Sequence, residues 1–108
     1  MDLWLDIVAA DGTALPPGSA LRVEVRDASW ADGPARVLHR METRTPADAA
    51  LFPVELRLDA RAAGAIVWVH LDADGDGKVS VGDYITTQSY PLASHAAARM
   101  RVELRRVG

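Results

Sequence analysis

Alternation of apolar and charged side chains with a period of two limits what this chain can fold into more than any other feature. The pattern is clearest in ALRVEVRD (20–27), FPVELRLD (52–59) and RMRVELRRV (99–107). Successive side chains of a β-strand point to opposite faces, so the pattern predicts strands with one buried face. An amphipathic helix would need apolar residues every three or four positions. The three segments therefore predict an all-β protein.

Other segments predict strands by their content of β-branched and aromatic residues. They are LWLDIVA (3–9), RVLHRMETRT (36–45), AIVWVHL (65–71) and DYITTQSY (83–90). AIVWVHL is almost continuously apolar, which is typical of a central strand and predicts Trp68 in the core. Turn-forming Gly, Pro and Asp residues lie between the segments. About seven short strands at this spacing predict one domain over residues 1–108, a seven-stranded antiparallel β-sandwich of immunoglobulin or prealbumin-like type.

Composition excludes several classes of protein. With 49% hydrophobic and 25% charged residues the chain has the balance of a soluble globular domain. No apolar run approaches the roughly 20 residues that span a bilayer. The absence of cysteine excludes disulfides, thiolate zinc sites and thiol nucleophiles. The start, MDLWLDIVAADG, lacks the pattern of a secretory signal, so a signal for an exported protein would lie outside this sequence. No basic run with interleaved aromatics indicates a nucleic-acid partner.

The net charge is concentrated in one short segment. The chain has 15 acidic and 12 basic residues, and the window 72–83 holds four aspartates against Lys78. Outside this window the charges balance at 11 of each sign. Such local acidity indicates a cation site rather than a general property of the surface.

The acidic segment has the ligand spacing of a twelve-residue calcium loop. Asp72, Asp74, Asp76 and Asp83 occupy positions 1, 3, 5 and 12, with the backbone carbonyl of Lys78 at position 7 and Ser80 at position 9, where a ligand often acts through water. The spacing, DxDxDGxxSxxD, resembles the loops of EF-hand and dockerin proteins. Because β-type segments flank it, we expect a structural Ca²⁺ site at the tip of a β-hairpin. A metal-free polar turn is the alternative, and Mg²⁺ fits less well.

Three classes of function stay open at this stage. The favoured one is non-catalytic binding, since no nucleophile elbow or phosphate loop is present and His39, His70 and His95 are too scattered for a zinc site. For His70, packing or a hydrogen bond at a strand end is the expected role. A carbohydrate or adhesion module would use exposed Trp4, Trp30 or Tyr90. A small hydrolase would need His39 or His70 to meet a serine or a carboxylate in a pocket.

One family shares the order of these motifs. ALPPGSALRVEVRDASWADGPARVLHR, LFPVELRLD, the strand before the acidic loop and DYITTQSYPL resemble the YscW or YbaY-like lipoprotein chaperones of type III secretion, from Ala14 to Leu92. The resemblance implies a β-sandwich in the periplasm or cell envelope that assists or binds another envelope protein or lipoprotein. Calcium does not carry over, because the acidic loop resembles an insertion. The open sheet edges also suggest strand addition or self-association.

Overall fold

The computed structural model describes residues 2–27, 36–47, 50–58, 65–87, 90, 92 and 99–108, and these ranges contain seven strands. The strands are β1 (Asp2–Ala9), β2 (Ala20–Asp27), β3 (Arg36–Arg44), β4 (Phe52–Arg57), β5 (Ile66–Asp72), β6 (Tyr84–Ile85) and β7 (Arg99–Arg106). The all-β prediction is confirmed. No helix that could cross a membrane occurs in the ranges given above.

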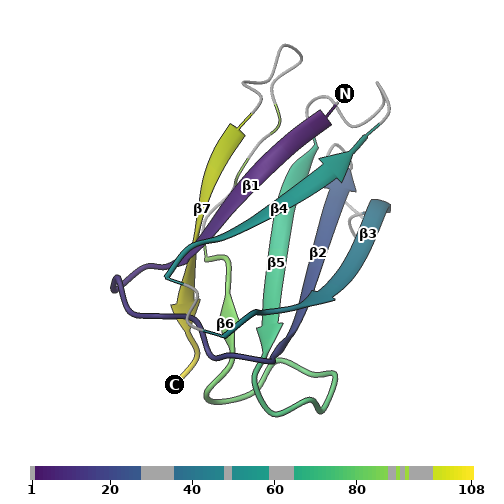
Figure 1. Cartoon of the computed structure of the whole chain (residues 1–108). Coiled ribbons are helices and arrows are strands. Elements are labelled where there is room, and N and C mark those ends of the chain that lie inside the picture. The colour runs from purple at the N-terminus through teal and green to yellow at the C-terminus, as the bar shows by residue number, and fades with distance from the viewer. Residues whose placement is uncertain are drawn as a thin grey trace.

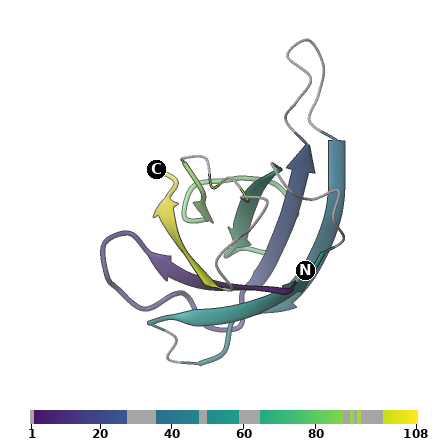
Figure 2. The ribbon, with the colours of Figure 1, turned by 90° about the horizontal axis from the view of Figure 1, so that it is seen from above.

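The strands form one mixed sheet in the order β3-β2-β5-β6-β7-β1-β4. The sheet curves into a half-barrel around its buried face, as Figures 1 and 2 show from two directions. Most neighbours are antiparallel, but β1 and β7 run parallel, with Trp4 opposite Arg99 and Ala9 opposite Leu104. The predicted purely antiparallel arrangement was therefore wrong, and the strands form a mixed half-barrel rather than a clear immunoglobulin or prealbumin-like sandwich. Period-two patterning determines which face of a strand is buried, but it does not determine which strand lies beside it.

The core fills the concave face of the sheet with aliphatic side chains. The residues predicted to face inward on β2, Leu21, Val23 and Val25, are all fully buried. Val102 and Leu104 of β7 are fully buried as well, while Met100 packs against the core from a partly buried position. At about 25 cal/mol per Å² of apolar surface, this burial is the main force that holds the strands together. The predicted alternation is thus confirmed for these strands.

Trp68 lies on the outer face of β5, which contradicts its predicted place in the core. Val67 and Val69 point inward, so Trp68 between them must point outward. There its ring lies under two guanidinium groups, with the Cζ of Arg26 at 4.2 Å and that of Arg22 at 5.9 Å from the ring centroid. The arginines of β2 shield the indole from water in place of a second layer of protein.

The strand predicted over residues 83–90 is much shorter than expected. Only Tyr84 and Ile85 form β6, although the amide of Thr86 still donates to the carbonyl of Val69 at 3.1 Å. Pairing with β5 resumes where the amide of Val67 donates to the carbonyl of Tyr90 at 3.0 Å. Between these two hydrogen bonds, β5 advances by two residues, from Val69 to Val67, while the paired segment advances by four, from Thr86 to Tyr90. This difference in length interrupts the regular hydrogen bonding of the two strands.

Candidate functional site

The acidic loop leaves β5 at Asp72 and returns to the sheet at Asp83, just before β6. Gly75 and Gly77 within it have φ angles of 72° and 76°, in the left-handed region that disfavours other residues. Turns of the backbone at these two glycines fold the exposed loop back on itself. The predicted calcium loop begins at the end of β5 and ends just before β6, and these two strands pair with each other.

The carboxylate of Asp72 organises the first half of the loop. It accepts hydrogen bonds from the amides of Gly75, at 3.0 Å, and Gly77, at 2.7 Å. The side chain is buried, with 8% of the residue exposed. An acceptor that satisfies amides three and five residues later closes a compact turn, in the way that Asx side chains stabilise turns generally.

The middle of the loop is held by hydrogen bonds to two further aspartates. Asp74 accepts a hydrogen bond of 2.8 Å from the Ser80 hydroxyl, and Asp76 accepts one of 2.9 Å from the amide of Lys78. The Ser80 hydroxyl also lies 3.4 Å from the Oδ2 of Asp83. Ser80 therefore connects the exposed carboxylate of Asp74 to the buried end of the loop.

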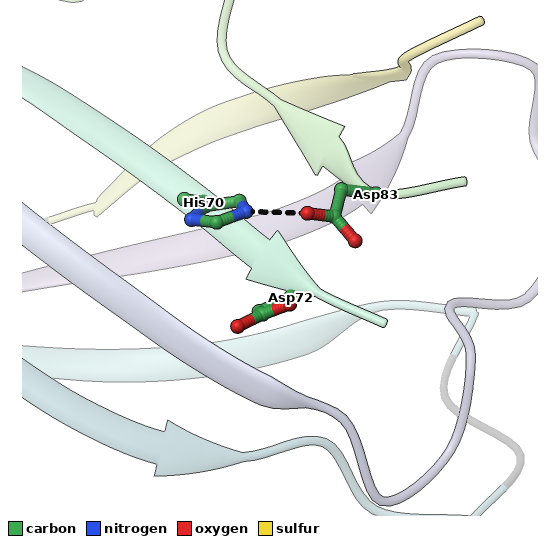
Figure 3. Close-up of side chains that lie close together, drawn as sticks. All are labelled: His70, Asp72 and Asp83. Atoms are coloured by element: carbon green, nitrogen blue, oxygen red, sulfur yellow. Dashed lines mark hydrogen bonds and ion pairs between the residues drawn. The ribbon is translucent and has the colours of Figure 1, made fainter. Parts of the chain in front are cut away.

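A buried histidine–carboxylate pair lies beneath the loop. His70 Nε2 and Asp83 Oδ2 are 2.8 Å apart, and both side chains are fully buried (Figure 3). The other imidazole nitrogen, Nδ1, lies 3.4 Å from Nη2 of Arg22. A guanidinium only donates, so Nδ1 must accept from Arg22 and the proton of neutral His70 lies on Nε2, facing Asp83. The prediction of a hydrogen-bonded His70 at a strand end is confirmed.

Hydrogen bonds set the protonation of two of the loop carboxylates. Burial raises the pKa of Asp83, but the hydrogen bonds from His70 and from the amides of Ala73 and Ser80 outweigh it and leave the pKa below its ordinary value. The Ser80 hydroxyl is the main reason that the pKa of Asp74 is lowered to about 2. Both carboxylates are therefore ionised at neutral pH.

The structure brings all four predicted aspartate ligands together. One carboxylate oxygen from each of Asp72, Asp74, Asp76 and Asp83 lies within 4.8 Å of the other three. Sequence reasoning did not count His70 among the candidate ligands, although it forms a second group of this kind with Asp72 and Asp83. The hard oxygens of the four-aspartate group suit Ca²⁺, which takes six to eight oxygen ligands. Ser80 lies at the side of the cluster, and Lys78 contacts it through its amide.

A cavity of about 580 Å³ opens beside the acidic loop on the outer face of the sheet. Three arginines line it, Arg22 of β2 with Arg40 and Arg44 of β3, together with Glu42. Its opposite wall is formed by the start of the loop, including Asp72 and Asp74. Sequence reasoning missed this cavity, although the alternation of β2 already placed Arg22 on the outer face.

Of the aromatic residues named for a carbohydrate platform, the structure describes Tyr90 and Trp4. Tyr90 is 8% exposed, and its hydroxyl accepts a hydrogen bond of 2.9 Å from the amide of Glu103. Trp4 is 37% exposed on β1, with the Arg99 guanidinium 5.8 Å from its ring centroid. Trp30 lies outside the described residues. Tyr90 therefore does not supply an exposed ring for the alternative of a carbohydrate or adhesion module.

His39 adds no further group to the site. His39 lies opposite Val25 and shares the inner face of edge strand β3 with Met41 and Thr43. Its neighbours on that face are thus apolar or uncharged. His95, like Ser89 and Ser94, lies outside the described residues.

Comparison with known proteins identifies relatives. Residues 6–104 match the family model described as "Type III secretion system lipoprotein chaperone (YscW)". Among solved structures, the chain is similar to an alternative pilotin from the type II secretion system of Vibrio cholerae, with a TM-score of 0.75 and 23% sequence identity. The match covers 100% of this chain and 97% of that one, and it shows a shared fold. No curated protein matches the chain.

Proposed function

Because this chain belongs to the type III secretion system lipoprotein chaperone (YscW) family, we propose that it binds a component of a secretion system in the bacterial envelope and performs no catalysis. The observation that carries this proposal is the extent of the family match, which runs from residue 6 in β1 to residue 104 in β7. The match therefore includes every strand of the half-barrel. The similarity to the pilotin supports the same architecture.

The geometry of His70 favours binding over hydrolysis. The pair with Asp83 meets the condition that sequence reasoning set for a hydrolase, because a histidine does contact a carboxylate. However, Nε2 faces Asp83 and Nδ1 faces Arg22, so both nitrogens already have partners. A general base needs one nitrogen within hydrogen-bond reach of the nucleophile. In this arrangement the pair holds the loop against the sheet.

The test of the proposed function is recovery of the partner from the native envelope. The chain carries a photo-crosslinking residue on the exposed outer face and is expressed in the bacterium that encodes it, with calcium or with chelator present. We expect a secretion-system component to be crosslinked and identified by mass spectrometry. Recovery of no such component from any position on the surface would refute the proposal.

We also propose that the loop over residues 72–83 binds Ca²⁺ in a structural role. The four carboxylates lie within one cluster, and the negative charges of Asp74 and Asp83 repel one another unless a cation compensates them; the spacing of the four supports a calcium site. A single loop without a paired partner should bind with a dissociation constant on the order of 10⁻⁴ to 10⁻³ M. Titration calorimetry with Ca²⁺, and with Mg²⁺ for comparison, tests this. The absence of a calcium-specific heat would exclude the site.

A further inference from the structure

Strand β3 is the more accessible of the two edges of the sheet. In the part of the chain that the structure describes, β3 and β4 end the strand order, and each pairs on one side only. β4 has six residues and contains Pro53, which has no amide to donate. β3 has nine residues and no proline, so its outer backbone groups are suited to pairing with another strand.

The register shows which backbone groups of β3 face outward. Just beyond β3, Thr45 makes both backbone bonds toward the β2 side, because its amide donates to Ser19 at 3.0 Å and its carbonyl accepts from Gly18 at 2.9 Å. Backbone groups of successive residues in a strand point to alternate sides. The amides and carbonyls of Arg44, Glu42 and Arg40 therefore face the open edge.

The two faces of β3 differ in chemistry. The outer face carries Arg40, Glu42 and Arg44, and Arg40 pairs with Glu42 at 2.8 Å in an exposed contact. The inner face carries Met41 and Thr43, both half-buried, and Met41 packs against the core. In a strand added at this edge, the side chains on one face would lie beside the arginines of β3, and those on the other face would lie beside Met41 and the apolar core.

The cavity beside the acidic loop, called the arginine cavity below, lies next to the outer face of β3 and extends from it toward β2. Arg22 is opposite Glu42 in the register, and its guanidinium is held by His70 Nδ1 and, at 3.5 Å, by the carbonyl of Gly77. On the far wall, both oxygens of Asp72 already accept amide hydrogen bonds from the loop. Asp72 and Asp74 lie on that far wall, whereas the side nearest β3 presents three arginines against one glutamate.

We propose that an extended acidic segment of the partner protein adds to the open edge of β3. Its acidic side chains lie beside Arg40 and Arg44 at the mouth of the cavity, and its alternate, apolar side chains cover Met41. This inference rests on the proposed binding function and names the surface and the chemistry of the partner segment. Charge complementarity selects an acidic segment, since the outer face of β3 and the neighbouring Arg22 carry more arginine than glutamate.

A labelled peptide of alternating glutamate and valine, about as long as β3, is the probe. Its binding to the whole chain is followed by fluorescence anisotropy. Two comparison peptides carry lysine for glutamate, or N-methyl groups on the amides that would pair with β3. We expect the acidic peptide to bind more weakly as salt is raised, and both comparison peptides to lose at least tenfold in affinity. Each removes one of the two required interactions, charge or backbone pairing.

Variants of the protein locate the binding surface. Arg40→Ser and Arg44→Ser should each weaken the acidic peptide about two- to fivefold, as expected for exposed ion pairs, and the double variant about tenfold. Arg101→Ser is the matched control, because Arg101 pairs with Glu103 two residues along an interior strand just as Arg40 pairs with Glu42. It should leave binding unchanged. Equal melting temperatures show that the variants remain folded.

Four results would overturn the inference: no binding of the acidic peptide, equal binding of the lysine or N-methylated peptide, equal loss in Arg101→Ser, and dimerisation of the chain through β3 that excludes the peptide. The proposed function is tested separately by crosslinking in the envelope. If the double variant still crosslinks to its partner, the β3 surface is wrong and the function stands. If the peptide binds but no secretion-system component is crosslinked, the surface stands and the function is wrong.

Discussion

His70 and Asp83 form a fully buried pair whose Nε2 and Oδ2 atoms are 2.8 Å apart, joining the end of β5 to the start of β6. The same carboxylate accepts the amides of Ala73 and Ser80 at 2.9 and 3.1 Å. One side chain thus satisfies donors from both ends of the acidic loop. Removing it would leave the fully buried Nε2 of His70, and the amides of Ala73 and Ser80, without this acceptor.

We therefore predict that Asp83→Ala lowers the free energy of unfolding by about 1–3 kcal/mol, the cost of leaving the buried Nε2–H of His70 without an acceptor. Urea denaturation in calcium-free buffer measures this. Asp76→Ala is the control, since Asp76 is exposed, and it should change the free energy by no more than about 0.5 kcal/mol. Similar losses of unfolding free energy in the two variants would mean that the buried pair stabilises the protein no more than an exposed carboxylate of the loop does.

Calcium should raise the melting temperature of the wild-type chain. At about 1 mM Ca²⁺ and a dissociation constant of about 0.1 mM, mass action adds roughly 1.4 kcal/mol of stability. The variant Asp74→Ala with Asp76→Ala should lose this increase, because both exposed carboxylates of the cluster are removed. Scanning calorimetry in calcium and in chelator makes the comparison. Identical melting of the wild type in both buffers would contradict the calcium proposal.

The stability of the metal-free chain should fall in acid because of Asp83. Its folded pKa lies below the ordinary value of 3.8, so the folded state binds fewer protons than the unfolded state as the pH falls. The contribution is fully present above about pH 4 and is lost as the pH drops through the lowered folded pKa. Urea denaturation across this range in chelator should show a shallower decline for Asp83→Asn. Parallel curves for the two proteins would show that Asp83 does not control the acid response.

The strands were predictable because alternation is a local property of the chain. Leu21, Val23 and Val25 are buried as their spacing requires, and the spacing of the aspartates predicted a cluster that the structure does form. The parallel pairing of β1 with β7 was not predictable, because it joins residues about 95 positions apart, such as Trp4 and Arg99, and depends on how the whole sheet curves.

The arginine cavity escaped prediction for a related reason. It forms only where Arg22 of β2, Arg40 and Arg44 of β3 and the acidic loop come together on one face. Each of these arginines, taken alone, is an ordinary solvent-facing residue of an alternating strand. The pairing of His70 with Asp83 likewise requires the β5–β6 register, which places His70 opposite Ile85, two residues after Asp83.

Trp68 lies in a strand whose two faces are both apolar, and in such a strand the sequence pattern does not determine which face is buried. Val67, Trp68 and Val69 fit a buried strand on either face, and only the sheet decides that the indole points outward under Arg26. We predict a coupling energy of about 0.5–1 kcal/mol between these two side chains, the usual strength of a partly exposed cation–π contact. A double-mutant cycle of Arg26→Met and Trp68→Leu, read by urea denaturation, measures it. Additive effects of the two substitutions would show that the arginine only covers the ring.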